Sequence, residues 1–134
     1  MTRRQAREQA FVLLFEKSFR EDEELQEIID AALENEMLVN DEFSLLLAKT
    51  ADENLDVIDS YIVKYSRGWT LRRIPKVCLA LMRLAVAEMF YIDSIPVNVS
   101  INEAVELSKI YGEATDSNFI NGILGSISRD KKDE

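Results

Sequence analysis

The sequence predicts an all-α protein of about seven helices that forms a single domain over residues 1–134. Only 4 glycines and 2 prolines occur in the chain, too few for the frequent turns of an all-β domain. Apolar residues recur at intervals of three and four, which is the spacing of one helix face, and a helix-start signal precedes most of these segments. Apolar residues make up 47% of the chain and charged residues 31%, which suits a folded protein with one core.

The first helix is expected to begin after Thr2. Thr2 and Gln5 have the spacing of a capping box, in which the hydroxyl accepts from a free backbone amide and the glutamine side chain reaches back. Arg3, Arg4 and Arg7 fall on one side of this helix and are expected to form a single guanidinium patch. With the free amides of the helix start, such a patch suits a phosphate; a solvated basic terminus is the alternative. The apolar face is expected to comprise Ala6, Ala10, Phe11, Leu13, Leu14, Phe15 and Phe19.

Three further helices are expected before residue 68. An amphipathic helix with a charged, solvated side covers 25–35, and Asn40 is placed to cap a third helix. Thr50 and Glu53 have the form of a second capping box that opens a fourth helix, which Gly68 ends.

The segment 76–92 is apolar almost all round, which predicts a central helix surrounded by the others. After it, Ser100 and Glu103 have the form of a third capping box, and Gly112 stands where a left-handed residue ends a helix. The last helix presents an apolar stripe of Phe119, Ile120, Ile123, Leu124 and Ile127.

Composition argues against an enzyme. Histidine is absent and Cys78 is the one cysteine, so histidine-dependent catalysis and internal disulfides are excluded, and we expect no metal site and no cofactor. Cys78 is interpreted as a small buried apolar residue. Glu103 and Glu106 are spaced for paired acid and base chemistry, but nothing else supports an active site. With no signal peptide and no membrane-spanning segment, the sequence predicts a cytoplasmic protein.

The net charge of −9 is distributed unevenly. Residues 1–20 carry +3, 21–59 carry −13, 60–87 carry +6 and 88–134 carry −5. An acidic protein with two basic segments can bind a polyanion where those segments meet. Independent solvated helix faces are the alternative.

A narrow strip of the last helix also stands out. Asn118, Gly122 and Gly125 lie along it, although glycine inside a helix costs about 1 kcal/mol relative to alanine. Such a strip permits close approach of a neighbouring helix or of a ligand, and helix packing is the favoured interpretation. Phe119 beside it can either fill the core or stack on an unpaired base, and core packing is favoured.

Several segments, in this order, resemble the NusB family of bacterial transcription antitermination factors. They are Arg3–Glu8, Trp69–Ile74, Arg83–Ala85 with Glu88, Ile95–Leu107, Tyr111–Gly112 and Phe119–Leu124. The resemblance implies an all-helical fold of two packed helical subdomains without catalysis. It further implies that the protein and NusE, a protein of the small ribosomal subunit, bind the single-stranded boxA element of nascent ribosomal RNA. The complex would act with RNA polymerase and other Nus factors in the elongation complex.

The resemblance also suggests functional residues. Those expected to contact RNA are Arg3, Arg4, Arg7, Lys109, Asn118 and Phe119. Those expected to contact NusE are Arg72, Arg73, Lys76, Cys78, Leu79 and Met82.

The chain departs from the family pattern at four positions. Cys78 and Leu79 replace an acidic and a basic residue, Ala87 replaces an aromatic one, and Asn118 replaces a frequent lysine. These changes imply a more apolar NusE contact and one weaker phosphate contact. Two other classes remain open, a helix-turn-helix DNA-binding regulator and a protein adaptor without RNA affinity. The apolar helix that follows the basic segment argues against the first class, and the arginine patch argues against the second.

Overall fold

The computed structural model describes residues 1–132, which hold seven α-helices, one short 3₁₀ helix and no β-strand. The expected all-α fold of about seven helices is therefore confirmed. In chain order the elements are α1 (Arg3–Lys17), α2 (Leu25–Glu34), α3 (Glu42–Glu53), α4 (Leu55–Tyr65), the 3₁₀ helix η1 (Leu71–Arg73), α5 (Lys76–Tyr91), α6 (Val97–Tyr111) and α7 (Asp116–Lys132).

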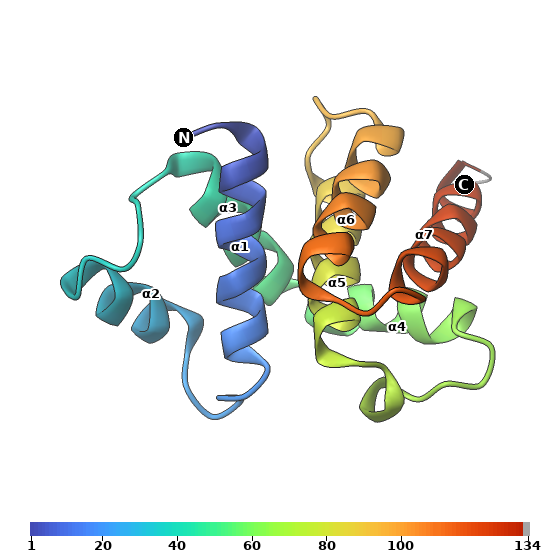
Figure 1. The fold of residues 1–134 in the computed structure, drawn as a ribbon, viewed down its shortest axis with the longest axis horizontal. Helices are drawn as coiled ribbons and strands as arrows, with labels where there is room; N and C mark the ends of the chain where they lie inside the picture. The colour runs from blue at the N-terminus through green and yellow to red at the C-terminus, as the bar shows by residue number, and fades with distance from the viewer. Residues whose placement is uncertain (133–134) are drawn as a thin grey trace.

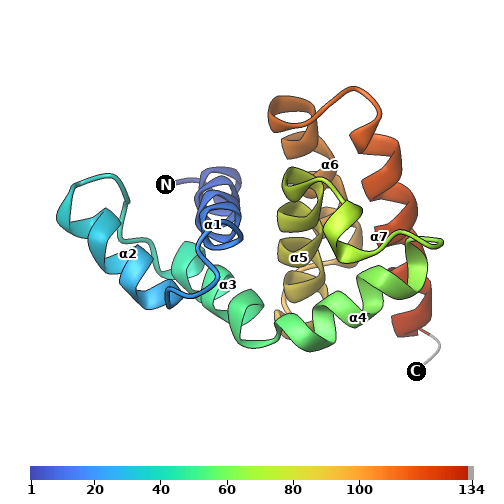
Figure 2. The ribbon, with the colours of Figure 1, turned by 90° about the horizontal axis from the view of Figure 1, so that it is seen from below.

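The helices form two groups that meet at α5. Figures 1 and 2 show α1, α2 and α3 on one side and α4, α6 and α7 with α5 on the other. α5 packs against α1 and α3 as well as against α4, α6 and α7. Eleven of its sixteen residues are buried, which confirms that the apolar segment forms a central helix. No helix among residues 1–132 has the length and apolar character needed to cross a membrane.

The start of α1 has the expected capping box. The backbone amide of Gln5 donates to Thr2 Oγ1 at 3.0 Å, and the amide of Thr2 donates to Gln5 Oε1 at 2.8 Å. α3 is capped one residue later than expected, since the amide of Ser44 donates to Asp41 Oδ2 at 2.9 Å. Asp41, and not Asn40, is the cap.

The other two expected capping boxes are wrong. Thr50 lies inside α3, and the helix breaks at Asn54, whose Nδ2 donates to the Thr50 carbonyl at 2.8 Å. α6 begins at Val97, directly after Pro96, because a proline disfavours helical geometry in the residue before it. Ser100 is therefore already inside the helix and buried. The serine-to-glutamate spacing of a capping box also occurs within helices, so the spacing alone did not locate the boundary.

Gly112 ends α6 in an extended conformation, with φ −106° and ψ −172°, so the expected left-handed residue is wrong. The glycine is needed for space instead. A Cβ atom at this position would lie 2.6 Å from Asp116 Oδ2 and 3.0 Å from the Ser108 carbonyl oxygen. The same Asp116 oxygen accepts from the amide of Glu113 at 2.7 Å and so closes the turn into α7.

Candidate nucleic-acid interface

Arg7 lies inside the protein, where it joins α1 to α5. Only 5% of Arg7 and 1% of Glu88 is exposed. Arg7 Nε and Nη2 both donate to the Glu88 carboxylate, and the shortest contact, Nη2 to Oε1, is 2.7 Å. The expected single exposed patch of three arginines is therefore wrong at Arg7, because moving this guanidinium to a phosphate would leave Glu88 buried and unpaired.

Arg3 and Arg4 remain exposed at the start of α1. Arg4 Nε donates to Glu103 Oε2 of α6 at 2.9 Å, while 60% of the Arg4 side chain stays exposed. This hydrogen bond raises the pKa of Arg4 above its ordinary value, so the group stays cationic. The Arg3 guanidinium carbon lies 3.9 Å from the ring centre of Phe43. Both cations are thus fixed in place without being buried.

Phe119 and Trp69 form an aromatic pair at the start of α7. Their ring centres are 6.0 Å apart in an edge-to-face arrangement, and 47% of Trp69 is exposed. They line a groove of about 380 Å³ together with Arg67, Asn118 and Gly122. With Tyr65, the groove thus combines three aromatic side chains, a cation and an amide. Phe119 is partly buried and packs against the core, which agrees with the favoured interpretation, and it also lines the groove.

The glycines of α7 do not pack against another helix. A Cβ atom at Gly122 would have nothing within 4 Å, and at Gly125 the nearest group would be Nη1 of Arg129 at 3.4 Å. The favoured packing interpretation is therefore wrong. The surface above Gly122 is open and glycine has no Cβ atom. A ligand can therefore approach the α7 backbone more closely than it could if another residue type stood at this position.

A second groove lies on the other side of Gly122. It has a volume of about 410 Å³ and is lined by Asn98, Asn102, Asn121 and Arg129 among others. Asparagine amides both donate and accept hydrogen bonds, and Arg129 supplies charge. Sequence reasoning did not single out these asparagines, because their alignment across α6 and α7 depends on how the two helices pack.

Lys109 is exposed on α6 and pairs with Glu106 at 3.0 Å, one turn earlier on the same helix. Lys109 lies about 9 Å along α6 from Glu103, the residue that holds Arg4. Figure 1 shows α6 running between the N-terminus of the chain and the start of α7. α6 thus carries Lys109 and the partner of Arg4, whereas the groove beside the aromatic pair is lined by α7 and the segment 65–69.

The residues expected to contact a partner divide into two groups. Arg72, Arg73 and Lys76 are exposed. In contrast, Cys78 and Met82 are fully buried and Leu79 is 6% exposed. These three belong to the core, because α5 is covered by neighbouring helices on this side. The full burial of Cys78 confirms its interpretation as a small buried residue, and burial, with a smaller contribution from Asp116, raises the pKa of its thiol to about 12.

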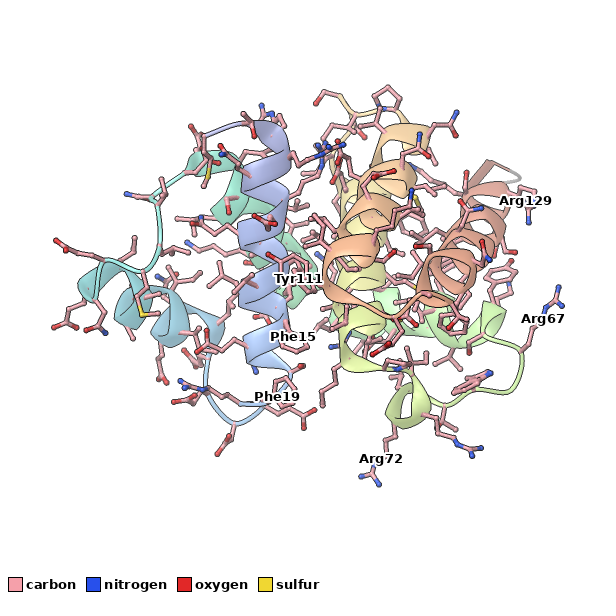
Figure 3. All side chains as sticks on the ribbon, viewed as in Figure 1. Phe15, Phe19, Arg67, Arg72, Tyr111 and Arg129 are labelled. Carbon is pink, nitrogen blue, oxygen red and sulfur yellow. The ribbon has the colours of Figure 1, made fainter. Side chains whose placement is uncertain are left out.

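Aromatic side chains that are exposed or partly buried lie along α1, and one of them is beside Lys76. Figure 3 shows Tyr111, Phe15 and Phe19 one below another along α1, and we refer to these three residues as the aromatic column. Phe19, expected in the core, is 61% exposed because α1 ends two residues before it. Lys76 Nζ lies 5.0 Å from the Phe19 ring centre and donates to the Ser18 carbonyl at 3.1 Å.

The two basic segments meet at the C-terminal end of α1, where Lys76 lies beside Ser18 and Phe19, and not at the N-terminal arginines. The N-terminus lies at one end of α1, while Figure 3 places Arg72 beyond the opposite end. Arg83 is not available to a polyanion, since it forms a bidentate pair with Asp59 at 2.8 Å. A polyanion site where the two basic segments meet would therefore lie at the end of α1 beside Lys76, and the N-terminal arginines form a separate cationic site.

Comparison with known proteins identifies what this arrangement is similar to. Residues 4–129 match the model of the NusB family. The transcription antitermination protein NusB of Acetivibrio thermocellus is 42% identical over 132 residues, covering 98% of this chain and 91% of the relative. The corresponding protein of Alkaliphilus oremlandii is 42% identical over 128 residues, covering 93% and 91%.

Solved structures agree with the sequence relatives. NusB of T. maritima superimposes with a TM-score of 0.86 at 34% identity, covering 96% of this chain and 92% of that one. A crystal structure of antitermination factors NusB and NusE in complex with double-stranded RNA matches with a TM-score of 0.83 at 28% identity, covering 97% and 99%.

Proposed function

The chain belongs to the NusB family of transcription antitermination proteins, and from this premise we propose that it acts with NusE to bind the boxA element of nascent ribosomal RNA. In the elongation complex, with RNA polymerase and other Nus factors, this binding helps the polymerase read through terminators. The protein acts by binding alone, without catalysis, and does so in the cytoplasm.

The open aromatic groove at the start of α7 carries the RNA part of the proposal. A base in single-stranded RNA can stack on an aromatic ring and present its edge to an amide. Phe119 and Trp69 supply rings, and Asn118 supplies the amide. The bare backbone at Gly122 lets the sugar and phosphate approach α7. Helix packing does not explain why this exposed position is a glycine, whereas a bound RNA strand does.

Exposed arginines supply charge along the rest of the strand. Arg4 pairs with Glu103 in the middle of α6, Arg3 lies over Phe43, Lys109 lies near the end of α6, and Arg67 lines the aromatic groove. Phosphate contacts of this kind give affinity without sequence preference and make binding sensitive to salt. Arg7 acts indirectly, since its pair with Glu88 fixes the start of α1 against α5.

The aromatic column and the neighbouring cations form the NusE contact. Phe19 is the most exposed ring of the three, and Lys76 covers part of it. Arg72 and Arg73 are exposed on η1, the 3₁₀ helix just before α5. An apolar centre with a cationic border is typical of a specific protein interface. Cys78, Leu79 and Met82 of α5 do not touch NusE themselves, because these three side chains are buried.

The test uses fluorescence anisotropy with a labelled boxA RNA, with and without NusE. Phe119→Leu keeps an apolar side chain for the core but removes the ring, and we expect it to weaken RNA binding about tenfold, the order of one lost stacking contact. Phe119→Tyr keeps the ring and should bind nearly as well as the parent. Arg3→Ala should weaken binding and lower the salt dependence, while neither Phe119 variant changes that dependence.

NusE binding is measured separately with Phe19→Glu, which we expect to remain folded and to lose NusE. RNA with a shuffled boxA sequence and a DNA duplex serve as controls. Equal affinity for boxA and shuffled RNA in the presence of NusE would contradict the proposal. Preference for the duplex would favour a DNA-binding regulator, and no nucleic-acid binding would favour an adaptor.

A further inference from the structure

An apolar groove separates α2 from α1 on the side of the molecule away from α7. Figures 1 and 2 show α2 at the outer edge of the bundle, where its main helix contact is α1. The groove has a volume of about 750 Å³. Among its lining residues, Val12 is 44% exposed, Val39 is 56% exposed and Met37 is 82% exposed. An apolar surface this open inside a concave site is typical of an interaction surface.

Hydrogen bonds of the Gln9 side chain hold this groove in a fixed shape. The Gln9 side chain on α1 forms two hydrogen bonds of 2.9 Å to the backbone of Val39, one to its carbonyl and one from its amide. Gln9 Nε2 also donates to Ser44 Oγ at 3.0 Å. The segment that carries Met37 and Val39 is therefore attached to α1, so the exposure of its apolar side chains belongs to a defined structure.

The turn that presents Met37 is strained. Glu36 has φ +56°, a left-handed conformation that is unfavourable for any residue with a Cβ atom. The amide of Met37 donates to the Ala32 carbonyl at 2.8 Å, and the amide of Glu36 donates to that of Leu33 at 3.1 Å. This pair of bonds ends α2 in a Schellman motif, in which the residue after the left-handed one usually packs back on the helix. Here that residue, Met37, stays exposed over the groove.

The border of the groove is acidic. Residues 21–48 contain ten acidic and no basic residues. Glu27 and Glu34 flank Ala31, a lining residue, at helix spacings of four and three, so they stand along one edge. Both are exposed and neither forms an ion pair within residues 1–132, and the same is true of Glu36. Arg20, which also lines the groove, is already paired with Glu16 and Glu23.

We propose that this groove binds a basic amphipathic helix of a protein partner. The apolar face of such a helix enters the groove between α1 and α2, and its lysine or arginine residues meet the unpaired glutamates of α2. This is the helix-in-groove mode of recognition, in which apolar anchors supply affinity and complementary charge supplies specificity. The site is separate from the RNA groove and from the aromatic column apart from Tyr111, which lines its edge.

Two other occupants fit the charges less well. RNA would be repelled by the glutamates of α2. A second copy of this chain in a two-fold arrangement would place the same surface against itself and so bring two acidic α2 edges together. Both alternatives give distinct results in the test below.

The probe is a synthetic leucine and lysine peptide of about 18 residues, long enough to form a helix, with leucines at intervals of three and four. Its control has the same composition with leucine and lysine alternating. Amide chemical shifts of the full chain, measured by NMR during titration, locate the binding site, and the titration gives the dissociation constant. We expect shifts at Val12, at Ala31 and over 37–39, and weaker binding of the alternating peptide.

Variants test the apolar and charged parts separately. Val12→Arg and Ala31→Arg each place a charge in the groove and should weaken binding at least about tenfold. Val57→Arg is the matched control, because Val57 is 47% exposed on α4, far from the groove. Glu27→Gln with Glu34→Gln should weaken binding at low salt, whereas Asp56→Asn with Asp93→Asn, the same change in charge elsewhere, should not.

Several results would overturn the proposal. These are equal binding by Val12→Arg and Val57→Arg, shifts outside the α1–α2 groove, and equal affinity for the alternating peptide. A dimer in sedimentation that Val12→Arg abolishes would assign the groove to a second copy. Shifts at the groove on adding boxA RNA would assign it to RNA. The peptide titrations and the sedimentation experiment do not depend on whether the chain binds boxA, so the proposal can be tested independently of the RNA function.

Discussion

Replacing Arg7 with methionine tests whether this residue is structural. Arg7→Met keeps most of the side-chain volume but leaves the Glu88 carboxylate, 1% exposed, without its bidentate partner. Breaking a buried ion pair on one side costs about 3 to 5 kcal/mol. At roughly 3 °C per kcal/mol for a chain of this size, the midpoint of thermal unfolding should fall by about 10 to 15 °C.

Urea unfolding, followed by circular dichroism, measures the change. The double variant Arg7→Met with Glu88→Leu removes both charges and should recover most of the lost free energy of unfolding, since two apolar side chains need no partner. Arg4→Met is the matched control: 60% of the Arg4 side chain is exposed and Glu103 keeps Arg7 Nη1 at 3.8 Å, so this change should leave the midpoint nearly unchanged. A loss below about 1 kcal/mol in Arg7→Met would refute the structural role and return Arg7 to the RNA-binding set.

Three further predictions follow from burial and open space. Gly122→Ala should raise the free energy of unfolding by up to about 1 kcal/mol through helix propensity, since a Cβ atom there meets nothing. The same change should weaken boxA binding. A stabilised variant with unchanged RNA affinity would exclude close approach of RNA at this residue. Cys78, whose pKa is raised to about 12, should resist iodoacetamide at pH 8 in the folded protein and react in urea; mass spectrometry measures both, and fast labelling of the folded chain would contradict its burial. Leu79→Glu should lose helical circular dichroism at room temperature, because it places an unpaired charge in the core; a folded variant that has lost only NusE would restore Leu79 to the interface.

The sequence patterns that predicted the structure correctly depend on residues that are close together in the chain. Thr2 and Gln5 are three residues apart, and the apolar character of 76–92 is independent of where other helices lie. Both features were predictable because short-range hydrogen bonding and the amount of apolar surface determine them. The boundary of α6 was missed because Ser100 and Glu103 have a capping-box spacing, whereas Pro96 sets the start of the helix.

The site was harder to predict because charge alone does not tell whether a residue is exposed. Arg3, Arg4 and Arg7 are alike in sequence, yet only Arg7 faces Glu88, a residue 81 positions away. Likewise Leu79 and Phe19 exchanged their expected places, since the end of α1 at Lys17 releases Phe19 while the packing of α5 encloses Leu79. Whether these side chains are buried or exposed depends on tertiary contacts, which cannot be read from a single sequence.

The acidic excess of the chain is compatible with RNA binding because it is concentrated away from α7. Of the net −9, the segment 21–59 alone carries −13, and most of its length forms α2 and α3, which Figure 1 places on the opposite side of α5 from α7. At physiological salt, charges separated by more than about 8 Å of solvent are largely screened, so a bound strand responds mainly to the cations and dipoles next to it. The same separation of charge makes the electrostatic potential on the α2 side negative, which suits a basic protein segment. One small helical protein can thus bind an anionic and a cationic partner at once, provided that the buried Arg7 and Glu88 pair keeps the two groups of helices in register.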